Sequence, residues 1–226
     1  MYPSILTESS TLQRVLAGDS LARYGDGEFN LAEGHSIPCQ RHSPELERRL
    51  RGILVDSGRC IVGIPNLDSA TPKAAFWHKY QRVTPLLAPG RVYGSSFISR
   101  PDSAPWVNTA TYWADIERLW AGLDVTVVRG AGSTKGLTRA DMTTAKSVRE
   151  VLCPRQHAFE EYADLLEAIG TPERVLLCCG PTATVLAVDL CRHGIHAVDC
   201  GHVALFLRKY RNGEPMIRTE ADKVLL

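Results

Sequence analysis

The 226-residue sequence lacks the features that would direct the protein to a polyanion or into a membrane. Lys and Arg number 26 against 25 for Asp and Glu, so the formal net charge is +1 and no strong field attracts nucleic acid or a charged membrane surface. No apolar run approaches the roughly 20 residues that a membrane-spanning helix needs. Residues 1–10 show no cationic start followed by an apolar run, so no secretory signal is expected. These absences favour a cytoplasmic protein with no transmembrane segment and no nucleic-acid partner.

The sequence also has no internal repeat, no low-complexity segment and no linker rich in proline, glycine or serine. One domain over residues 1–226 is therefore the simplest organisation. Seven cysteines are scattered along the chain, and Cys178 and Cys179 lie in an apolar run that is typical of a buried strand. An odd number of cysteines in this pattern favours reduced thiols in a cytosol over a set of disulfides.

Apolar runs that predict strands alternate along the chain with segments that predict helices. The expected strands are the run that opens Leu21–Phe29, then Cys60–Pro65, Arg91–Ser99, Asp124–Val128, Val151–Cys153, Arg174–Cys179 and Ile195–Cys200. The expected helices are Thr11–Ala17, the segment that Ser43-Pro44 opens, Lys73–Tyr80, Ala104–Ala121, Thr144–Glu150, His157–Ile169 and Ala183–Arg192. Arg208–Gly213 is expected to form a turn or an edge. This alternation predicts the α/β class, with a single doubly wound, mostly parallel Rossmann-like sheet and helices on both faces.

Two carboxylates alternate with two glycines at the end of the first predicted strand. In an extended backbone Asp26 and Glu28 would lie on one face, and Gly25 and Gly27 would let a bulky ligand approach closely. Carboxylates held together repel each other unless a cation or a shared proton lies between them. Such a pair suits Mg²⁺ or Mn²⁺, which keeps several waters and also binds substrate phosphates. The alternative is a tight turn in which Glu28 caps the next helix.

Two further glycine-rich turns follow predicted strands. In the first, Gly180-Pro181 would start a helix whose free amides and positive dipole end suit a phosphate, with hydroxyls from Thr182 and Thr184; a plain turn is the alternative. The second, Gly130–Gly136, is neither a Walker A loop nor a dinucleotide fingerprint, but Lys135 could reach a phosphate from it. A solvated surface loop is the alternative there. Because ligands bind beyond the carboxyl ends of the strands in such sheets, these turns are expected to converge on one rim.

Other clusters carry weaker signals. Cysteines and histidines gather between residues 191 and 202, but their spacing matches no common zinc pattern. Tryptophans recur every seven residues at Trp106, Trp113 and Trp120, a spacing that is more typical of a packed helix face than of a platform for stacking a sugar. An imidazole ordinarily titrates near neutrality, so His202 is a candidate base, with a structural role as the alternative.

Several motifs together resemble the GT-D-type glycosyltransferases, a Rossmann-like family with an Asp-x-Glu metal motif. The matching segments, from about residue 20 to residue 202, are Arg23–Phe29, Val62–Pro65, Phe76-Trp77, Phe97–Pro101, Cys153-Pro154 with Ala158-Phe159, Gly180–Ala187 and Asp199–His202. The chain departs from the family at Thr134–Asp141 and at Val203–Phe206, which bears on the acceptor and the donor but leaves the metal motif intact.

The resemblance implies transfer of a sugar from a nucleoside diphosphate donor, expected to be a UDP-sugar, to a glycan, a glycoconjugate or another hydroxyl acceptor. It implies Mn²⁺ or Mg²⁺ on Asp26 and Glu28. It does not identify the catalytic base, for which His202 is a candidate from imidazole chemistry alone. The expected donor-binding residues are Arg23, Gly25, Gly27, Arg100, Lys135, Gly180, Pro181, Thr182 and Thr184. The sequence leaves open whether the protein forms a homo-oligomer. A metal-dependent hydrolase of nucleotide-sugars or phosphoesters, which needs no acceptor, and a non-catalytic nucleotide-binding module, which needs no metal, are the alternatives.

Overall fold

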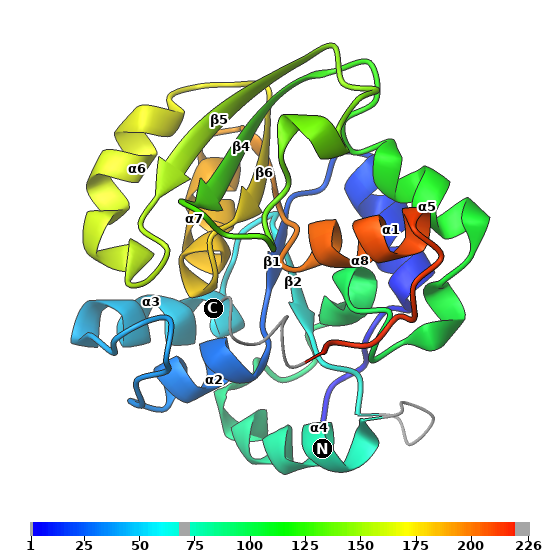
Figure 1. Ribbon diagram of the computed structural model, residues 1–226. Helices are drawn as coiled ribbons and strands as arrows, with labels where there is room; N and C mark the ends of the chain where they lie inside the picture. Colours follow the sequence, from blue (N-terminus) through cyan, green and yellow to red (C-terminus); the bar gives the residue numbers. More distant parts are fainter. Residues whose placement is uncertain (1, 68–72, 220–226) are drawn as a thin grey trace.

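The computed structural model describes residues 2–67 and 73–219, and its central feature is one seven-stranded sheet (Figure 1). The strands are β1 (Leu21–Arg23), β2 (Ile61–Ile64), β3 (Gly94–Ser95), β4 (Asp124–Gly130), β5 (Ser147–Cys153), β6 (Arg174–Cys178) and β7 (His196–Asp199). Their order is β3-β2-β1-β7-β6-β4-β5, and every neighbouring pair is parallel. The prediction of a doubly wound parallel sheet is confirmed.

Helices cover both faces of this sheet (Figure 1). One layer contains α2 (Asp26–Ala32), α3 (Pro44–Val55), α6 (Tyr162–Ile169) and α7 (Pro181–Arg192). The other contains α1 (Glu8–Leu16), α5 (Ala110–Glu117) and α8 (Val203–Arg211). Helix α7 packs on β1, β6 and β7 at the centre of the sheet, and almost all of its residues are buried. A short helix, α4 (Ala74–His78), and 3₁₀ segments at Lys79–Leu86, Ser96–Ser99, Pro105–Val107, Arg139–Asp141 and Ala158–Glu161 complete the described elements.

The central strands and several helix starts agree with the sequence. Helix α3 begins at Pro44 because Ser43 caps it: the Ser43 hydroxyl accepts a hydrogen bond from the Leu46 amide at 3.2 Å. The sequence places the end of this helix at Gly58, which is late, since the helix ends at Val55. The predicted strand Arg91–Ser99 forms only Gly94–Ser95 before a 3₁₀ turn, and the predicted helix Ala104–Ala121 is interrupted after a 3₁₀ turn at residues 105–107.

Two predicted elements are wrong. Residues 144–150 were expected to be helical, but β5 starts at Ser147 and pairs with β4 along its full length. Because β5 is an edge strand whose residues alternate toward solvent, it tolerates polar side chains that resemble a helix surface. Residues 208–213 were expected to form a turn or an edge, but helix α8 continues through Arg211. Its apolar residues Val203, Phe206 and Leu207 recur at helical spacing, and basic side chains near its end complement the helix dipole.

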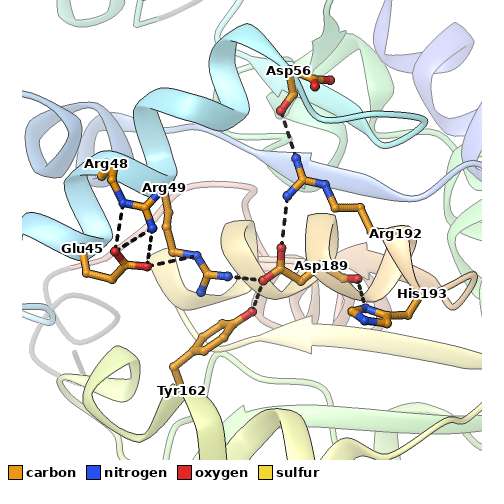
Figure 2. Close-up of polar contacts among 8 residues, drawn as sticks. All are labelled: Glu45, Arg48, Arg49, Asp56, Tyr162, Asp189, Arg192 and His193. Carbon is orange, nitrogen blue, oxygen red and sulfur yellow. Dashed lines mark hydrogen bonds and ion pairs between the residues drawn. The ribbon is translucent and has the colours of Figure 1, made fainter.

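A polar cluster joins three helices of the α7 layer (Figure 2). The Asp189 carboxylate of α7 accepts hydrogen bonds from Arg49 of α3 and from the Tyr162 hydroxyl of α6, while Arg192 lies 3.5 Å from its other oxygen. The Arg49 guanidinium also lies over the Tyr162 ring, 4.4 Å from the ring centroid. These contacts pair the charge of Asp189 with that of Arg49, and they fix how α3 and α6 lie against α7.

All seven cysteines belong to the described ranges, and each has a free thiol. This agrees with the expectation of reduced cysteines. Within residues 2–67 and 73–219, no helix combines the length and apolar character needed to cross a membrane.

Candidate functional site

A cavity of about 340 Å³ lies at the carboxyl ends of the strands. Residues that follow β1, β4, β6 and β7 line it, so the three glycine-rich turns converge on one rim as predicted. Strand β1 is the point at which the strand order reverses: β2 lies on one side of it and β7 on the other. Ligands usually bind at such a point in a doubly wound sheet. The predicted site residues that line it are Arg23, Gly25, Asp26, Gly27, Glu28, Arg100, Lys135, Gly180, Pro181 and His202.

The two motif carboxylates lie on a helix rather than on a strand. Strand β1 ends at Arg23, Gly25 is the N-cap of α2, and Asp26 is the first residue of that helix. The Glu28 Oε2 atom accepts a hydrogen bond from the Gly25 amide at 2.7 Å. The extended backbone expected here is therefore wrong, and the capping alternative is correct. Both carboxylates nevertheless line the cavity, and the positive end of α2 favours their charge.

The surroundings of Glu28 disfavour the ionised form of its carboxyl group. Burial, the nearby Asp199 and then Asp26 raise the pKa of Glu28 to about 7, although the Gly25 amide acts in the opposite direction. Burial also raises the pKa of Asp199, against the effect of Arg23. A positive ion between these carboxylates would relieve both costs.

Asp26 and Glu28 fit a divalent cation whose remaining coordination positions are filled by water and by substrate oxygens. No group of three histidine, cysteine or acidic side chains gathers as a metal site in the described part of the chain. Asp26 and Glu28 supply two carboxylates at one cavity, and one Glu28 oxygen is already used as a cap. Mg²⁺ and Mn²⁺ accept such a sparse oxygen set when water and phosphate oxygens fill the remaining positions.

Arg23 lines the cavity, but its guanidinium is committed to the protein. Its Nη2 atom lies 2.8 Å from Asp199 Oδ1, and its Nε donates to the Asp199 carbonyl at 2.7 Å. Its Nη1 donates to the Ser99 hydroxyl at 2.7 Å and to the Ser96 carbonyl at 3.1 Å. Arg23 therefore holds the ends of β1 and β7 and the 3₁₀ turn after β3 together, and supports the cavity instead of offering a free cation.

Gly201 makes this arrangement sterically possible. A Cβ atom at position 201 would lie 1.8 Å from Arg23 Nη2, and the backbone there has a φ of +47°. Both observations require glycine, because other residues rarely adopt such a φ and would collide with the guanidinium.

Cationic side chains also line this cavity. Arg100 pairs with Asp102 through two contacts, Nε to Oδ1 at 2.7 Å and Nη2 to Oδ2 at 3.0 Å. Burial alone would raise the pKa of Asp102, but hydrogen bonds and charge from Arg100 and Lys73 lower it to about 2. Lys135 is buried at the same cavity. The positive charges of Arg100 and Lys135 suit an anionic ligand such as a diphosphate.

His202 lies just before α8 and keeps a neutral imidazole near pH 7. Burial lowers its pKa well below the usual value, and the charges of Arg100, Arg218 and Lys135 lower it further. A neutral imidazole can accept a proton, although the surrounding cations weaken it as a base.

Thr182 and Thr184 are not among the residues that line the cavity. Both side chains are fully buried, and the Thr184 hydroxyl donates to the Arg23 carbonyl at 2.9 Å. The Thr182 hydroxyl has no hydrogen-bond partner in the described part of the chain. The structure thus brings Gly180 and Pro181 to the cavity, whereas both threonines are buried in α7 and Thr184 joins this helix to β1.

Sequence reasoning missed several lining residues, among them Arg155, Arg218 and Trp77. Arg155 follows β5, and the Cys153-Pro154 pair that ends the predicted strand could have located it beside the other strand ends. Arg218 comes from the segment after α8, where no element was predicted. No local pattern would have revealed it.

The family model for the glycosyltransferase GT-D fold matches residues 21–223. A probable glycosyl transferase, Gly, of Streptococcus gordonii is 31% identical over 217 residues, which cover 88% of this chain and 32% of that protein. The glycosyltransferase GlyD of Streptococcus pneumoniae serotype 4 is 32% identical over 202 residues, which cover 81% of this chain and 25% of that protein. The chain thus spans about a third or less of the length of these curated relatives.

Solved structures agree with this match. A structure described as a domain of unknown function 1792 with a distinct glycosyltransferase fold is 31% identical, has a TM-score of 0.83, and covers 93% of this chain and 82% of its own. A structure described as a new glycosyltransferase from Streptococcus sanguinis is 31% identical with a TM-score of 0.81, covering 93% of this chain and 85% of its own. The family match along nearly the whole sheet, with the two motif carboxylates at the strand ends, shows that the chain belongs to the glycosyltransferases of the GT-D fold.

Proposed function

We propose that this chain transfers a sugar from a nucleoside diphosphate sugar, with UDP as the nucleotide, to a hydroxyl of a glycan or glycoconjugate. The observation that carries the proposal is one cavity with carboxylates and cations on its walls. Asp26 and Glu28 supply the negative groups, and Arg100 and Lys135 supply positive ones. A diphosphate held between a divalent cation and basic side chains needs both.

Each group has a distinct role in this proposal. Asp26 and Glu28 would hold Mn²⁺ or Mg²⁺, which when bound supplies positive charge against the leaving diphosphate. Arg100 and Lys135 bind and orient the phosphates, and Gly180 and Pro181 at the start of α7 line the same cavity. Arg23 supports the cavity by its hydrogen bonds to Asp199 at the end of β7 and to Ser99 next to Arg100.

His202 is the group that we propose to accept the proton of the attacking hydroxyl. Its imidazole lines the cavity, and its lowered pKa keeps it in the accepting form near pH 7. A diphosphate beside Arg100 and Lys135 would offset part of their positive charge, and would thereby raise the pKa of His202 toward a value at which it is a more effective base.

The decisive experiment is a screen of nucleotide-sugars with Mn²⁺ against lipid-linked, protein-linked and free glycan acceptors. We expect transfer with a UDP-sugar, loss of transfer in EDTA, and loss in Asp26→Asn, which keeps the side-chain size but removes the charge. Asp164→Asn is the matched control, because Asp164 is an exposed acid in the first turn of α6. Free sugar released without acceptor, at a rate similar to any transfer, would instead identify a hydrolase. Nucleotide binding that is unaffected by EDTA, with no turnover, would identify a binding module.

A further inference from the structure

A second cavity, of about 420 Å³, lies between the starts of α1 and α5, in the helical layer opposite α7. Its lining residues are Thr7, Glu8, Ser9, Leu12, Trp106, Val107, Thr109, Thr111, Tyr112 and Asp115. None of them lines the cavity at the strand ends. The two cavities thus share no lining residue among those described, and the residues assigned to the proposed transfer lie in the first.

Trp106 is the principal feature of this cavity. The predicted packed face of three tryptophans is not formed, because Trp113 and Trp120 are buried whereas Trp106 is 46% exposed. The Trp106 Nε1 atom donates to Glu8 Oε2 at 2.9 Å. Glu8 is 4% exposed, and its Oε1 atom accepts from the Ser95 hydroxyl at 2.8 Å.

These contacts hold the indole in place while they leave its apolar surface uncovered. The only polar atom of the side chain is already paired with a buried carboxylate, so the surface left to solvent is hydrocarbon. A large aromatic ring fixed in one position and exposed beside a cavity loses little freedom when a ligand stacks on it.

The remaining lining groups define the class of ligand. Among residues 2–67 and 73–219, no lysine, arginine or histidine lines this cavity, so the described lining offers no cationic partner to a phosphate or a nucleotide. Asp115 Oδ1 lies 2.9 Å from Arg118 Nη1, and both oxygens of Glu8 already accept hydrogen bonds. Both carboxylates at this cavity thus have partners within the protein, which disfavours a cationic peptide as the ligand. Exposed hydroxyls of Ser9 and Thr111 lie at the same cavity.

We propose that the cavity between α1 and α5 is a binding site for a neutral saccharide, with one sugar ring stacked on Trp106. A sugar ring has an apolar face that complements an indole and hydroxyl edges that complement serine and threonine side chains. The site holds a saccharide apart from the cavity at the strand ends, and this binding does not depend on the nucleotide, the cation or the transfer reaction.

The test follows the Trp106 indole proton by NMR while the protein is titrated with short oligosaccharides of glucose, galactose and N-acetylglucosamine. Trp106→Phe identifies the resonance by its loss. We expect at least one saccharide to shift it in a saturable manner. The Trp106→Ala variant, followed by calorimetry, should bind that saccharide at least roughly tenfold more weakly, because a stacking contact is lost.

Phe76→Ala is the matched control, since Phe76 is another exposed aromatic side chain (40%) outside both cavities. It should bind the saccharide as the wild type does. Trp106→Phe keeps a ring and should retain part of the affinity, which separates stacking from a general loss of structure. The proposal is overturned if no saccharide shifts the Trp106 resonance, or if Phe76→Ala weakens binding as much as Trp106→Ala. An oligolysine peptide is titrated in parallel, and a shift produced by this peptide alone would also overturn the proposal.

Discussion

Glu28 shows how one side chain combines a structural and a proposed functional role. As a helix cap it accepts the Gly25 amide, and as a cavity residue it keeps a pKa raised to about 7. In the absence of a cation, the folded protein binds a proton at Glu28 that the unfolded chain would release near pH 4.5. Glu28 therefore lowers the free energy of unfolding as the pH rises from about 4.5 through 7.

Glu28→Gln should for this reason be more stable than the wild type at high pH. The amide oxygen can still accept from Gly25, while the ionisation is removed. We expect a gain of about 1–3 kcal/mol near pH 8, since one pKa unit corresponds to about 1.4 kcal/mol and Glu28 is only partly buried. Urea denaturation in EDTA at about pH 8 and about pH 4 measures it. A difference of equal size at both values would show that ionisation is not the cause.

The two threonines of α7 should respond in opposite ways to removal of a hydroxyl. Thr184→Val loses the hydrogen bond to the Arg23 carbonyl and should lower the free energy of unfolding by about 1–2 kcal/mol. Thr182→Val removes a buried hydroxyl that has no partner among the described residues, and should be neutral or stabilising. Thermal unfolding of both variants measures this. Weaker UDP binding by Thr182→Val with unchanged stability would contradict the packing role.

At the scale of elements, the sequence predicts what local chemistry determines. The Ser43-Pro44 start of α3 and the apolar strands β6 and β7 follow from capping and continuous burial. The strand predicted at Val151–Cys153 is the second half of β5, but its first half, residues 147–150, could not be predicted, because an edge strand with polar residues on its exposed side is defined by its pairing with β4.

The same division applies to the candidate site. Asp26 and Glu28 were found from their spacing, yet the backbone that presents them is helical, since the Glu28 cap favours a helix over an extended strand. Arg155 and Arg218 reach the cavity through tertiary packing of segments that carry no motif. Spacing thus identified the carboxylates, whereas only the assembled sheet shows which cations line the same cavity.

The Asp189 cluster should contribute measurably to the packing of α3 and α6 on α7. Asp189→Ala leaves the Arg49 guanidinium and the Tyr162 hydroxyl without their shared acceptor. We expect a loss of about 2–4 kcal/mol, below the cost for a fully buried pair because 14% of the Asp189 side chain and 22% of the Arg49 side chain are exposed.

Urea denaturation measures this loss, and Asp164→Asn again serves as the control for an exposed acid. None of the residues that contact Asp189 lines the cavity at the strand ends, so UDP affinity should stay unchanged at a temperature where the variant is folded. An unaltered free energy of unfolding would mean that solvent replaces the cluster without cost.

At the scale of the whole molecule, ligand binding and stability are linked. UDP at a hundred times its dissociation constant adds roughly 2.7 kcal/mol to the free energy of unfolding. For a chain of this size that corresponds to a rise of the melting temperature on the order of 5–10 °C. We expect this rise with Mn²⁺ or Mg²⁺ and a much smaller one with EDTA.

Differential scanning fluorimetry provides the measurement, and Asp26→Asn should remove the part that depends on the metal. His202→Gln should keep it, because His202 is assigned to the attacking hydroxyl and not to the cation. An equal rise with and without EDTA would show that UDP binds without the carboxylate pair.

The close contact between Gly201 and Arg23 has an evolutionary consequence. A Cβ at position 201 would occupy the space of the guanidinium, and the positive φ there disfavours other residues, so a substitution at 201 requires both a shorter side chain at position 23 and a changed backbone. Shortening position 23 would in turn leave the buried Asp199 unpaired. The three positions should consequently change together or not at all among homologous chains, and their covariation can be counted in any sufficiently diverse set of sequences.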